Sequence, residues 1–110
     1  MHVEVVTEAP SGWVVVALRG DLDLAGLPSL RSRLRSLAPG DRGVVVDLDP
    51  VDVLEAESLG VFLGLAARLR RTGRDLRLVS TIDRHLELFE LTGVDRALAV
   101  HGSIVDATDD

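Results

Sequence analysis

The sequence predicts an α/β fold in which a mixed sheet of four to five strands packs against three to four helices. Two apolar runs rich in valine, Trp13–Leu18 and Val44–Val46, are typical of strands that are covered on both faces. The segments that follow them repeat leucine at helical spacing, so strands and helices alternate along the chain. This alternation favours parallel strand pairs in most of the sheet.

The first two strands are predicted to form an antiparallel hairpin. From His2 to Thr7 valines roughly alternate with polar residues, and the turn residues Ala9–Gly12 separate this strand from the run Trp13–Leu18. Because so short a link joins antiparallel neighbours, the N-terminal strand is expected at an edge of the sheet. The next segment, Arg19–Asp23, is predicted to be a loop.

A helix and a parallel strand come next. Leucines at helical spacing mark a helix from about Ala25 to Leu37, with Pro28 tolerated in its first turn and Pro39-Gly40 ending it. A strand from Gly43 to Leu48 follows, and this strand-helix-strand order predicts a right-handed parallel crossover.

The central helix is predicted from about Glu57 to Arg71, after an acidic connection that begins at Asp47. Ser58 is the predicted N-cap, and Gly73 suits the position that ends a helix. The expected core stripe is Leu59, Phe62, Leu63, Ala66 and Leu69.

The rest of the chain is predicted to contain a strand over Leu76–Ser80, a helix to Leu91, a short strand over Ala97–His101 and a helical turn over Ser103–Ala107. Ser80 and Asp83 form a variant of the capping box at the start of that helix, and Gly93 ends it.

Composition narrows the classes of function. The length of 110 residues suits a single domain, which we expect to span residues 1–110. The absence of cysteine and lysine excludes thiolate catalysis, Cys-type zinc sites and Schiff-base chemistry. The net charge of −6 argues against direct nucleic-acid binding. No apolar run reaches the ~20 residues that span a bilayer, and no signal peptide is recognisable, so we expect a cytoplasmic protein without a membrane partner.

Arginines gather toward the C-terminal ends of the first two predicted helices. They are Arg31, Arg33, Arg35, Arg68, Arg70 and Arg71. Cations at these positions complement the helix dipole. A solvated face is one interpretation, and a site for an anion is the other.

Carboxylates follow the two central strands: Asp21 and Asp23 come after the first, and Asp47, Asp49, Asp52, Glu55 and Glu57 after the second. We expect them to converge, because the C-terminal ends of parallel strands form the usual functional edge of such a sheet. Solvated loops explain them without a ligand, and a Mg²⁺ site is a second interpretation. No motif in the sequence supplies a nucleophile, an oxyanion hole or a cofactor loop. The histidines lack metal-ligand spacing, and His85 is predicted to lie on a helix surface. We therefore expect no enzyme activity, no cofactor and no metal site.

The segment VVVDLDPVDVLEAESLGVFLGLAARLRRTGRDLRLV resembles the centre of STAS domains of the anti-sigma factor antagonist type. In that family a strand and a hydrophobic turn lead to Asp-Ser-Ser-Gly-Leu-Gly at the start of a helix. The alignment through Leu54, Leu59, Gly60 and Val61 places the family's Asp-Ser-Ser-Gly on Glu55, Ala56, Glu57 and Ser58. Further matches are Gly20–Asp23, Pro28 and Leu88–Leu98, so the resemblance covers nearly the whole chain and implies a STAS-like fold.

The resemblance implies a regulatory protein-binding module. In the family this loop and helix bind an anti-sigma factor or a related histidine-kinase-like ATPase domain. That partner phosphorylates the second serine of the motif, and the phosphorylated protein no longer binds it. Glu57 stands at that phosphoacceptor position and cannot accept a phosphate, and Ser58 is the rival acceptor if the register shifts by one residue. STAS domains also serve as small-ligand sensors or as structural modules of signalling assemblies, which is the alternative function. The oligomeric state stays open.

On the central helix, Gly60 and Gly64 lie beside Val61 and Leu65, both expected to be exposed, which suggests a docking face. Close packing of the glycines inside the domain is the other interpretation. The expected partner-binding residues are Asp21, Asp23, Glu55, Glu57, Ser58, Gly60, Val61, Gly64 and Leu65.

The turn after Val46 also looks like the phosphoacceptor turn of a response-regulator receiver. A receiver needs a lysine late in the chain and a second α/β unit between its acidic residues. This chain has no lysine, and only one predicted helix separates Asp23 from Asp47, so we reject this interpretation.

Overall fold

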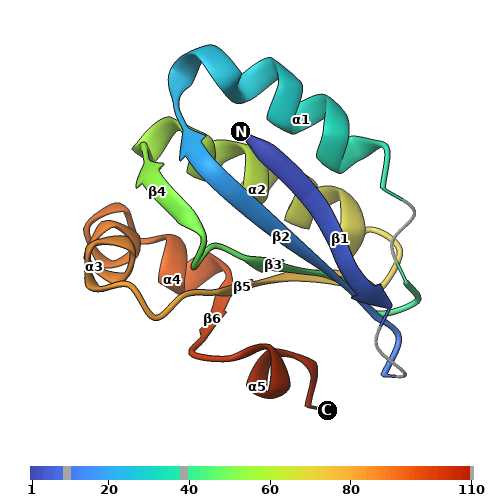
Figure 1. Ribbon diagram of the computed structural model, residues 1–110. Coiled ribbons are helices and arrows are strands. Elements are labelled where there is room, and N and C mark those ends of the chain that lie inside the picture. The colour runs from blue at the N-terminus through green and yellow to red at the C-terminus, as the bar shows by residue number, and fades with distance from the viewer. Residues whose placement is uncertain (9–10, 38–39, 110) are drawn as a thin grey trace.

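The computed structural model describes residues 1–8, 11–37 and 40–109. Ala9, Pro10 and Pro39, where the sequence predicts turns, lie outside these residues. The described elements are β1 (His2–Glu8), β2 (Trp13–Leu22), the 3₁₀ helix η1 (Leu24–Gly26), α1 (Leu27–Arg35), β3 (Gly43–Asp47), β4 (Val51–Leu54), α2 (Ala56–Arg70), β5 (Asp75–Val79), α3 (Asp83–Thr92), α4 (Val94–Ala97), β6 (Ala99–His101) and α5 (Ile104–Thr108) (Figure 1).

The described strands form one mixed sheet in the order β1-β2-β3-β5-β6, with β4 paired to the far end of β2. β1 is antiparallel to β2 and lies at the edge, as the short link predicts, and the other pairs are parallel. The predicted mixed α/β fold with an antiparallel N-terminal strand is therefore confirmed. The described part of the chain contains more strands and helices than expected, chiefly because of β4 and the short helix α4.

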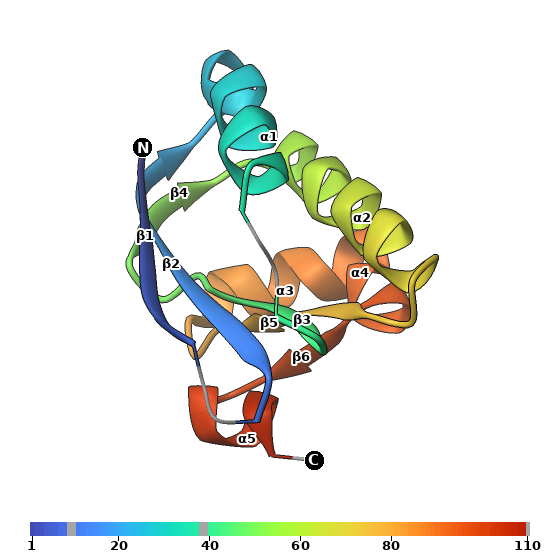
Figure 2. The ribbon, with the colours of Figure 1, turned by 90° about the vertical axis from the view of Figure 1, so that its right-hand side faces the viewer.

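Apolar side chains pack on both faces of the sheet. The larger core cluster joins one face of the sheet to α1, α2, α3 and α4, whereas the smaller one lies under α5 on the opposite face (Figures 1 and 2). Arg77 helps to hold α5, since its Nη1 donates to the backbone oxygen of Ala107 at 2.8 Å and its guanidinium lies 4.3 Å from the centre of the Trp13 ring. This packing explains why the valines of β2 and β3 form unbroken runs.

The segment Arg19–Leu22 continues β2, so the predicted loop at this position is wrong. The extension pairs in parallel with β4, where Asp21 lies opposite Val53 and Leu22 opposite Leu54. β4 lies within the segment predicted to be an acidic connection between a strand and the central helix. Neither segment was recognisable alone, because β4 is only four residues long and the end of β2 is mostly polar, so each is supported by its pairing with the other.

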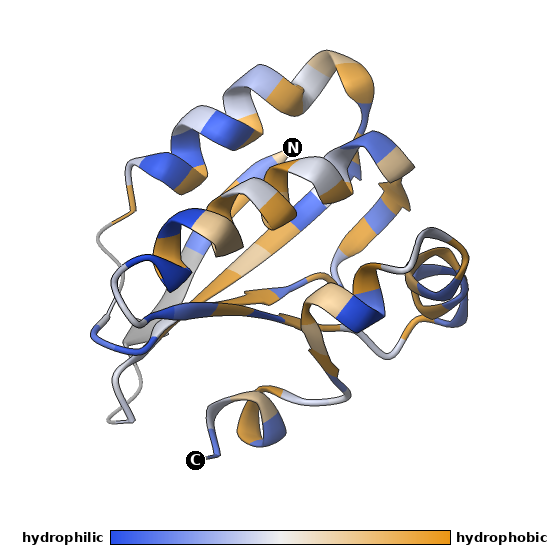
Figure 3. Cartoon of the chain, turned by 180° about the vertical axis from the view of Figure 1, so that it is seen from behind, coloured by the Kyte–Doolittle hydropathy of each residue, from blue (hydrophilic) through white to orange (hydrophobic). Residues whose placement is uncertain are grey.

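Helix α2 packs on the sheet along one side and against α1 along another (Figure 3), and most of its large apolar side chains are buried. Phe62 is fully buried, as expected, but Leu63 is 37% exposed, so its assignment to the core is wrong. Val61 is buried instead, because α1 covers the side of α2 on which it lies.

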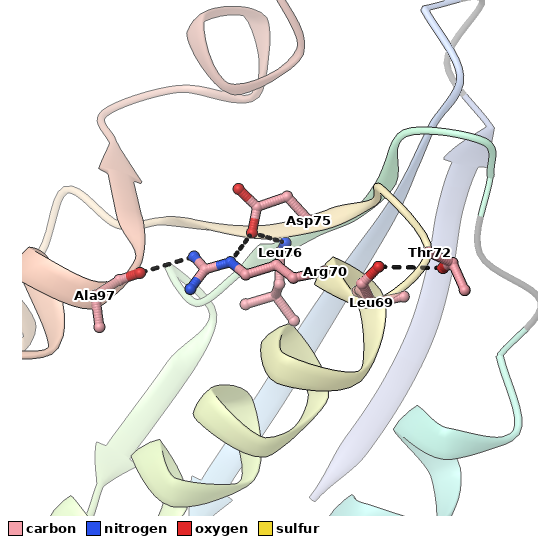
Figure 4. Close-up of polar contacts among 6 residues, drawn as sticks. All are labelled: Leu69, Arg70, Thr72, Asp75, Leu76 and Ala97. Carbon is pink, nitrogen blue, oxygen red and sulfur yellow. Dashed lines mark hydrogen bonds and ion pairs between the residues drawn. The ribbon is translucent and has the colours of Figure 1, made fainter.

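The C-terminal end of α2 is fixed by Arg70 (Figure 4). Its Nε donates to Asp75 Oδ1 at 2.8 Å, and its Nη2 donates to the backbone oxygen of Ala97 at 2.7 Å. The hydroxyl of Thr72 donates to the backbone oxygen of Leu69 at 3.1 Å, and the backbone N–H of Arg74 donates to the same oxygen at 3.0 Å. Gly73 follows with φ +76°, the left-handed conformation expected there. None of the helices in the described segments is long and apolar enough to cross a membrane.

Candidate functional site

The carboxyl ends of β2 and β4 bring distant parts of the chain together at the start of α2. The two strands run side by side and end at one edge of the sheet (Figure 1). The backbone N–H of Glu55 donates to the backbone oxygen of Leu22 at 3.0 Å. In return, Glu55 Oε2 accepts the backbone N–H of Leu24 at 3.2 Å. Through these two hydrogen bonds, Glu55 joins the segment that follows β2 to the segment that precedes α2.

The predicted convergence of all the carboxylates is only partly correct. Asp23 lies beside Glu55, where its Oδ1 accepts the Gly26 N–H at 3.0 Å and caps η1. Asp47, however, pairs with Ala17, well before the end of β2. Asp49 lies beside the end of β5, and its two oxygens accept the backbone N–H and the hydroxyl of Thr81 at 2.6 and 3.1 Å. Within the described residues, no three His, Cys, Asp or Glu side chains are grouped so that they could hold a metal ion.

Glu57 and Ser58 face opposite environments in the first turn of α2. Glu57, the second residue of the helix, is exposed to solvent. Ser58 is 0% exposed, and its Oγ donates to the backbone oxygen of Glu55 at 2.6 Å. The N-cap is Glu55, so the assignment of Ser58 to that position is wrong. Ser58 is instead an inward-facing residue that steadies the first turn.

Two large apolar side chains are exposed around this helix start. Leu24, next to Glu55, is 63% exposed, and Val53 of β4 is 45% exposed. Asp21, opposite Val53 in the strand pair, is exposed as well. We call Asp21, Leu24, Val53 and Glu57 the α2 N-terminal surface. Leu24 and Val53 were not predicted, and the sequence gives no signal that singles them out, because each stands beside other apolar residues.

The glycines of α2 lie in open space. Gly60 and Gly64 are exposed, and among the described residues a Cβ added at either one would meet no group outside its own helix turn within 4 Å. Close internal packing is therefore not the reason for these glycines. Val61 is buried and Leu65 is half-buried, so the expectation that both are exposed is wrong. Both instead line a hollow between α1 and α2.

Comparison with known proteins assigns the fold to a family. A family model described as "Mlab, STAS domain" matches residues 5–105. The chain belongs to the STAS domain family. The anti-sigma-B factor antagonist of Staphylococcus aureus (strain NCTC 8325 / PS 47) is 28% identical over 102 residues, which cover 92% of this chain and 94% of that protein.

Two solved structures share the fold of this STAS domain. An anti-sigma factor antagonist from Mycobacterium paratuberculosis matches with a TM-score of 0.73 and 24% identity, over 96% of this chain and 91% of that one. SpoIIAA, described as a Bacillus cell fate determinant and solved in unphosphorylated and phosphorylated forms, matches in the unphosphorylated form with a TM-score of 0.74 and 17% identity, over 98% and 92% of the chains. The STAS-like fold implied by the sequence is thereby confirmed.

In this STAS domain His85 is buried against β4 rather than placed on a helix surface, so that assignment is wrong. It is 1% exposed, and its Nδ1 is hydrogen-bonded to Ser80 Oγ at 2.8 Å. Ser80 also accepts the Ile82 N–H at 3.2 Å, while the N-cap of α3 is Ile82. The predicted capping box of Ser80 and Asp83 therefore does not form. Ser80 holds His85 in place instead.

Burial makes His85 a source of acid sensitivity. Loss of hydration lowers the pKa of His85 from its usual value, and the neighbouring Arg84 charge lowers it further. Because the folded-state pKa lies below that of the unfolded chain, stability is fully present above about pH 6.5 and falls as the pH drops through the folded-state value. Urea unfolding at about pH 7.5 and 5.5 should show a loss of up to about 1.4 kcal/mol per pH unit that His85→Gln removes. An equal acid loss in the variant would contradict this.

Proposed function

We propose that this STAS domain is a regulatory protein-binding module of the anti-sigma factor antagonist type, which captures an anti-sigma factor or a related histidine-kinase-like ATPase domain. The observation that carries the proposal is the α2 N-terminal surface: Leu24 and Val53 are exposed on the segments that lead to the start of α2, and Glu57 is exposed in its first turn. Protein interfaces combine apolar anchors with charged groups in this way. The likeness to an anti-sigma-B factor antagonist supports this class of partner.

The exposed glycines extend the proposed docking surface along α2. Gly60 and Gly64 carry no side chain that would keep a partner away from the helix backbone, and no group in the described part of the chain fills the space beside them. Asp23, Glu55 and Ser58, which the sequence analysis also assigned to partner binding, have a supporting role in this proposal, because each fixes the backbone beneath the surface. Val61 and Leu65 face the hollow between α1 and α2.

Glu57 takes the place of the phosphoacceptor serine of the resembling family, so we infer that this position is no longer switched. A carboxylate carries one charge and two oxygens, whereas a phosphate adds about −1.5 to −2 charges, so Glu57 is an incomplete mimic of the phosphorylated state. Ser58 would have to leave its hydrogen bond to Glu55 and its buried position before a kinase could reach it. Both features support a module that stays competent to bind.

A capture experiment with matched variants tests the proposal. The tagged domain is incubated with an extract of its own cells, and bound proteins are identified by mass spectrometry. We expect the wild type to retain a protein with a histidine-kinase-like ATPase domain, and Val53→Arg to retain at least about tenfold less, since a charge desolvated at an interface is costly.

The control for this experiment is Val105→Arg, which places the same substitution on an exposed valine of α5, on the opposite face of the sheet. Val105→Arg should retain the partner at the wild-type level. Failure of the wild type to capture a kinase-like ATPase would contradict the proposed function. Equal capture by Val53→Arg and Val105→Arg would contradict the proposed surface.

A further inference from the structure

A hollow lies between α1 and α2, on the far side of the glycines from the start of α2. It consists of two adjoining parts of about 110 and 290 Å³, which share Leu34, Arg35, Leu65 and Arg68 as walls. The smaller part begins at Gly60 and Gly64, and the larger part continues toward the C-terminal end of α2. From Gly60 to Leu69 the helix rises about 14 Å, at 1.5 Å per residue.

The floor of the hollow is apolar. The larger part reaches down between the helices to Val44 of β3, and Leu34 of α1 and Leu69 of α2 form its sides. All three side chains are almost completely buried, whereas Leu65 is half-buried at the mouth. The apolar surface therefore lies deep between the helices, and little of it is presented outward.

The rim of the hollow is cationic. It carries Arg31, Arg35, Arg68, Arg71 and Arg74. Among the described residues that line the two parts there is no aspartate or glutamate. Arg74 donates to Thr72 Oγ1 at 2.8 Å, while Arg31, Arg35, Arg68 and Arg71 make no hydrogen bond or ion pair within the described part of the chain. In a protein with a net charge of −6, this rim is an isolated positive region.

We propose that the hollow between α1 and α2 binds an anionic amphiphile, an aliphatic chain that ends in a carboxylate. The aliphatic chain lies between Leu34 and Leu69 above Val44, and the carboxylate is held at the rim by Arg35 and Arg68. These two arginines line both parts of the hollow and come from different helices. Guanidinium groups match a carboxylate because they donate two parallel hydrogen bonds to it.

The shape of the hollow favours a slim ligand over a partner helix. A helix that docks in a groove needs a broad exposed strip of apolar side chains to receive its anchors. Here the apolar side chains lie at the bottom, and an approaching helix would meet mainly guanidinium groups. The hollow shares Gly60 and Gly64 with the proposed docking surface along α2 but none of the residues of the α2 N-terminal surface, and this inference does not depend on the proposed function.

Titration with decanoate, below its micelle concentration, tests the proposal by amide NMR. Gly60 and Gly64 are useful reporters because they lie at the mouth of the hollow and glycine amides occupy a distinct spectral region. We expect saturable one-to-one shifts at both glycines. In the double variant Arg35→Gln/Arg68→Gln the dissociation constant should rise by about tenfold or more, because two charge-assisted hydrogen-bonding groups are lost.

Three controls make the outcome decisive. Arg96→Gln, on the exposed surface of α4, should bind decanoate like the wild type. Decyltrimethylammonium, which has the same tail and a cationic head, and butyrate, which has a short tail, should not saturate the site. Thermal unfolding verifies that each variant is folded. The proposal would be overturned if the decanoate shifts did not saturate, or if the double variant bound decanoate with the wild-type affinity. It would also be overturned if an acidic amphipathic peptide saturated the site and decanoate did not.

Discussion

Replacing Phe62 by alanine is expected to lower the free energy of unfolding by about 3–5 kcal/mol. Its ring is 0% exposed and belongs to the larger core cluster, which joins α2 to the sheet. Removal of the ring leaves a cavity that surrounding side chains cannot fill completely. The expected cost is a large share of the ~5–15 kcal/mol that stabilises a typical domain. Urea denaturation followed by circular dichroism measures it.

The adjacent residue provides the control for this prediction. Leu63 is 37% exposed and lies outside the core clusters, so Leu63→Ala should cost about 1 kcal/mol or less. Equal costs for the two variants would show that the buried face of α2 is rotated from the one described above.

Phosphorylation is expected to be absent from the wild type and to appear in Glu57→Ser. The exposed second position of α2 is accessible to a kinase, and the substitution supplies the hydroxyl that the resembling family carries there. Incubation with the captured kinase and ATP, followed by intact-mass measurement, should add no phosphate to the wild type and up to one per molecule of Glu57→Ser. Peptide mapping should place that phosphate at position 57.

Ser58→Ala separates the two candidate acceptors. In the double variant Glu57→Ser/Ser58→Ala the phosphate should remain, because Ser58 is buried and hydrogen-bonded to Glu55. The alignment would be contradicted if wild-type Ser58 took up stoichiometric phosphate and Ser58→Ala abolished it. Ser58 would then be the phosphoacceptor of a switch like that of the resembling family.

Elements with a strong local pattern were predictable from the sequence, and those supported by distant pairing were not. The valine runs of β2 and β3 and the leucine spacing of α1 and α2 carry their own signal. β4 has only four residues, three of them apolar, and is defined by its pairing with residues about thirty positions earlier. Such a pair has no signature within either segment alone.

Side-chain environments were harder to predict than elements. Serine is a common N-cap residue, but the chain enters α2 directly from β4. Glu55 is therefore the N-cap, and Ser58 lies buried in the first turn of the helix. His85 was placed on a helix surface, although β4, which the sequence did not reveal, leaves it buried. The position of the candidate site at the end of a parallel strand was predictable from topology, whereas its apolar members Leu24 and Val53 required the structure.

The most direct test of the proposed function is the release of a sigma factor from its anti-sigma factor. The captured anti-sigma factor is purified as a complex with the sigma factor it holds, and this STAS domain is added in increasing amounts. We expect the wild type and Val105→Arg to free the sigma factor as they reach equimolar amounts with the anti-sigma factor, and Val53→Arg to leave it bound. A complex that remains intact at saturating wild-type protein would contradict the account.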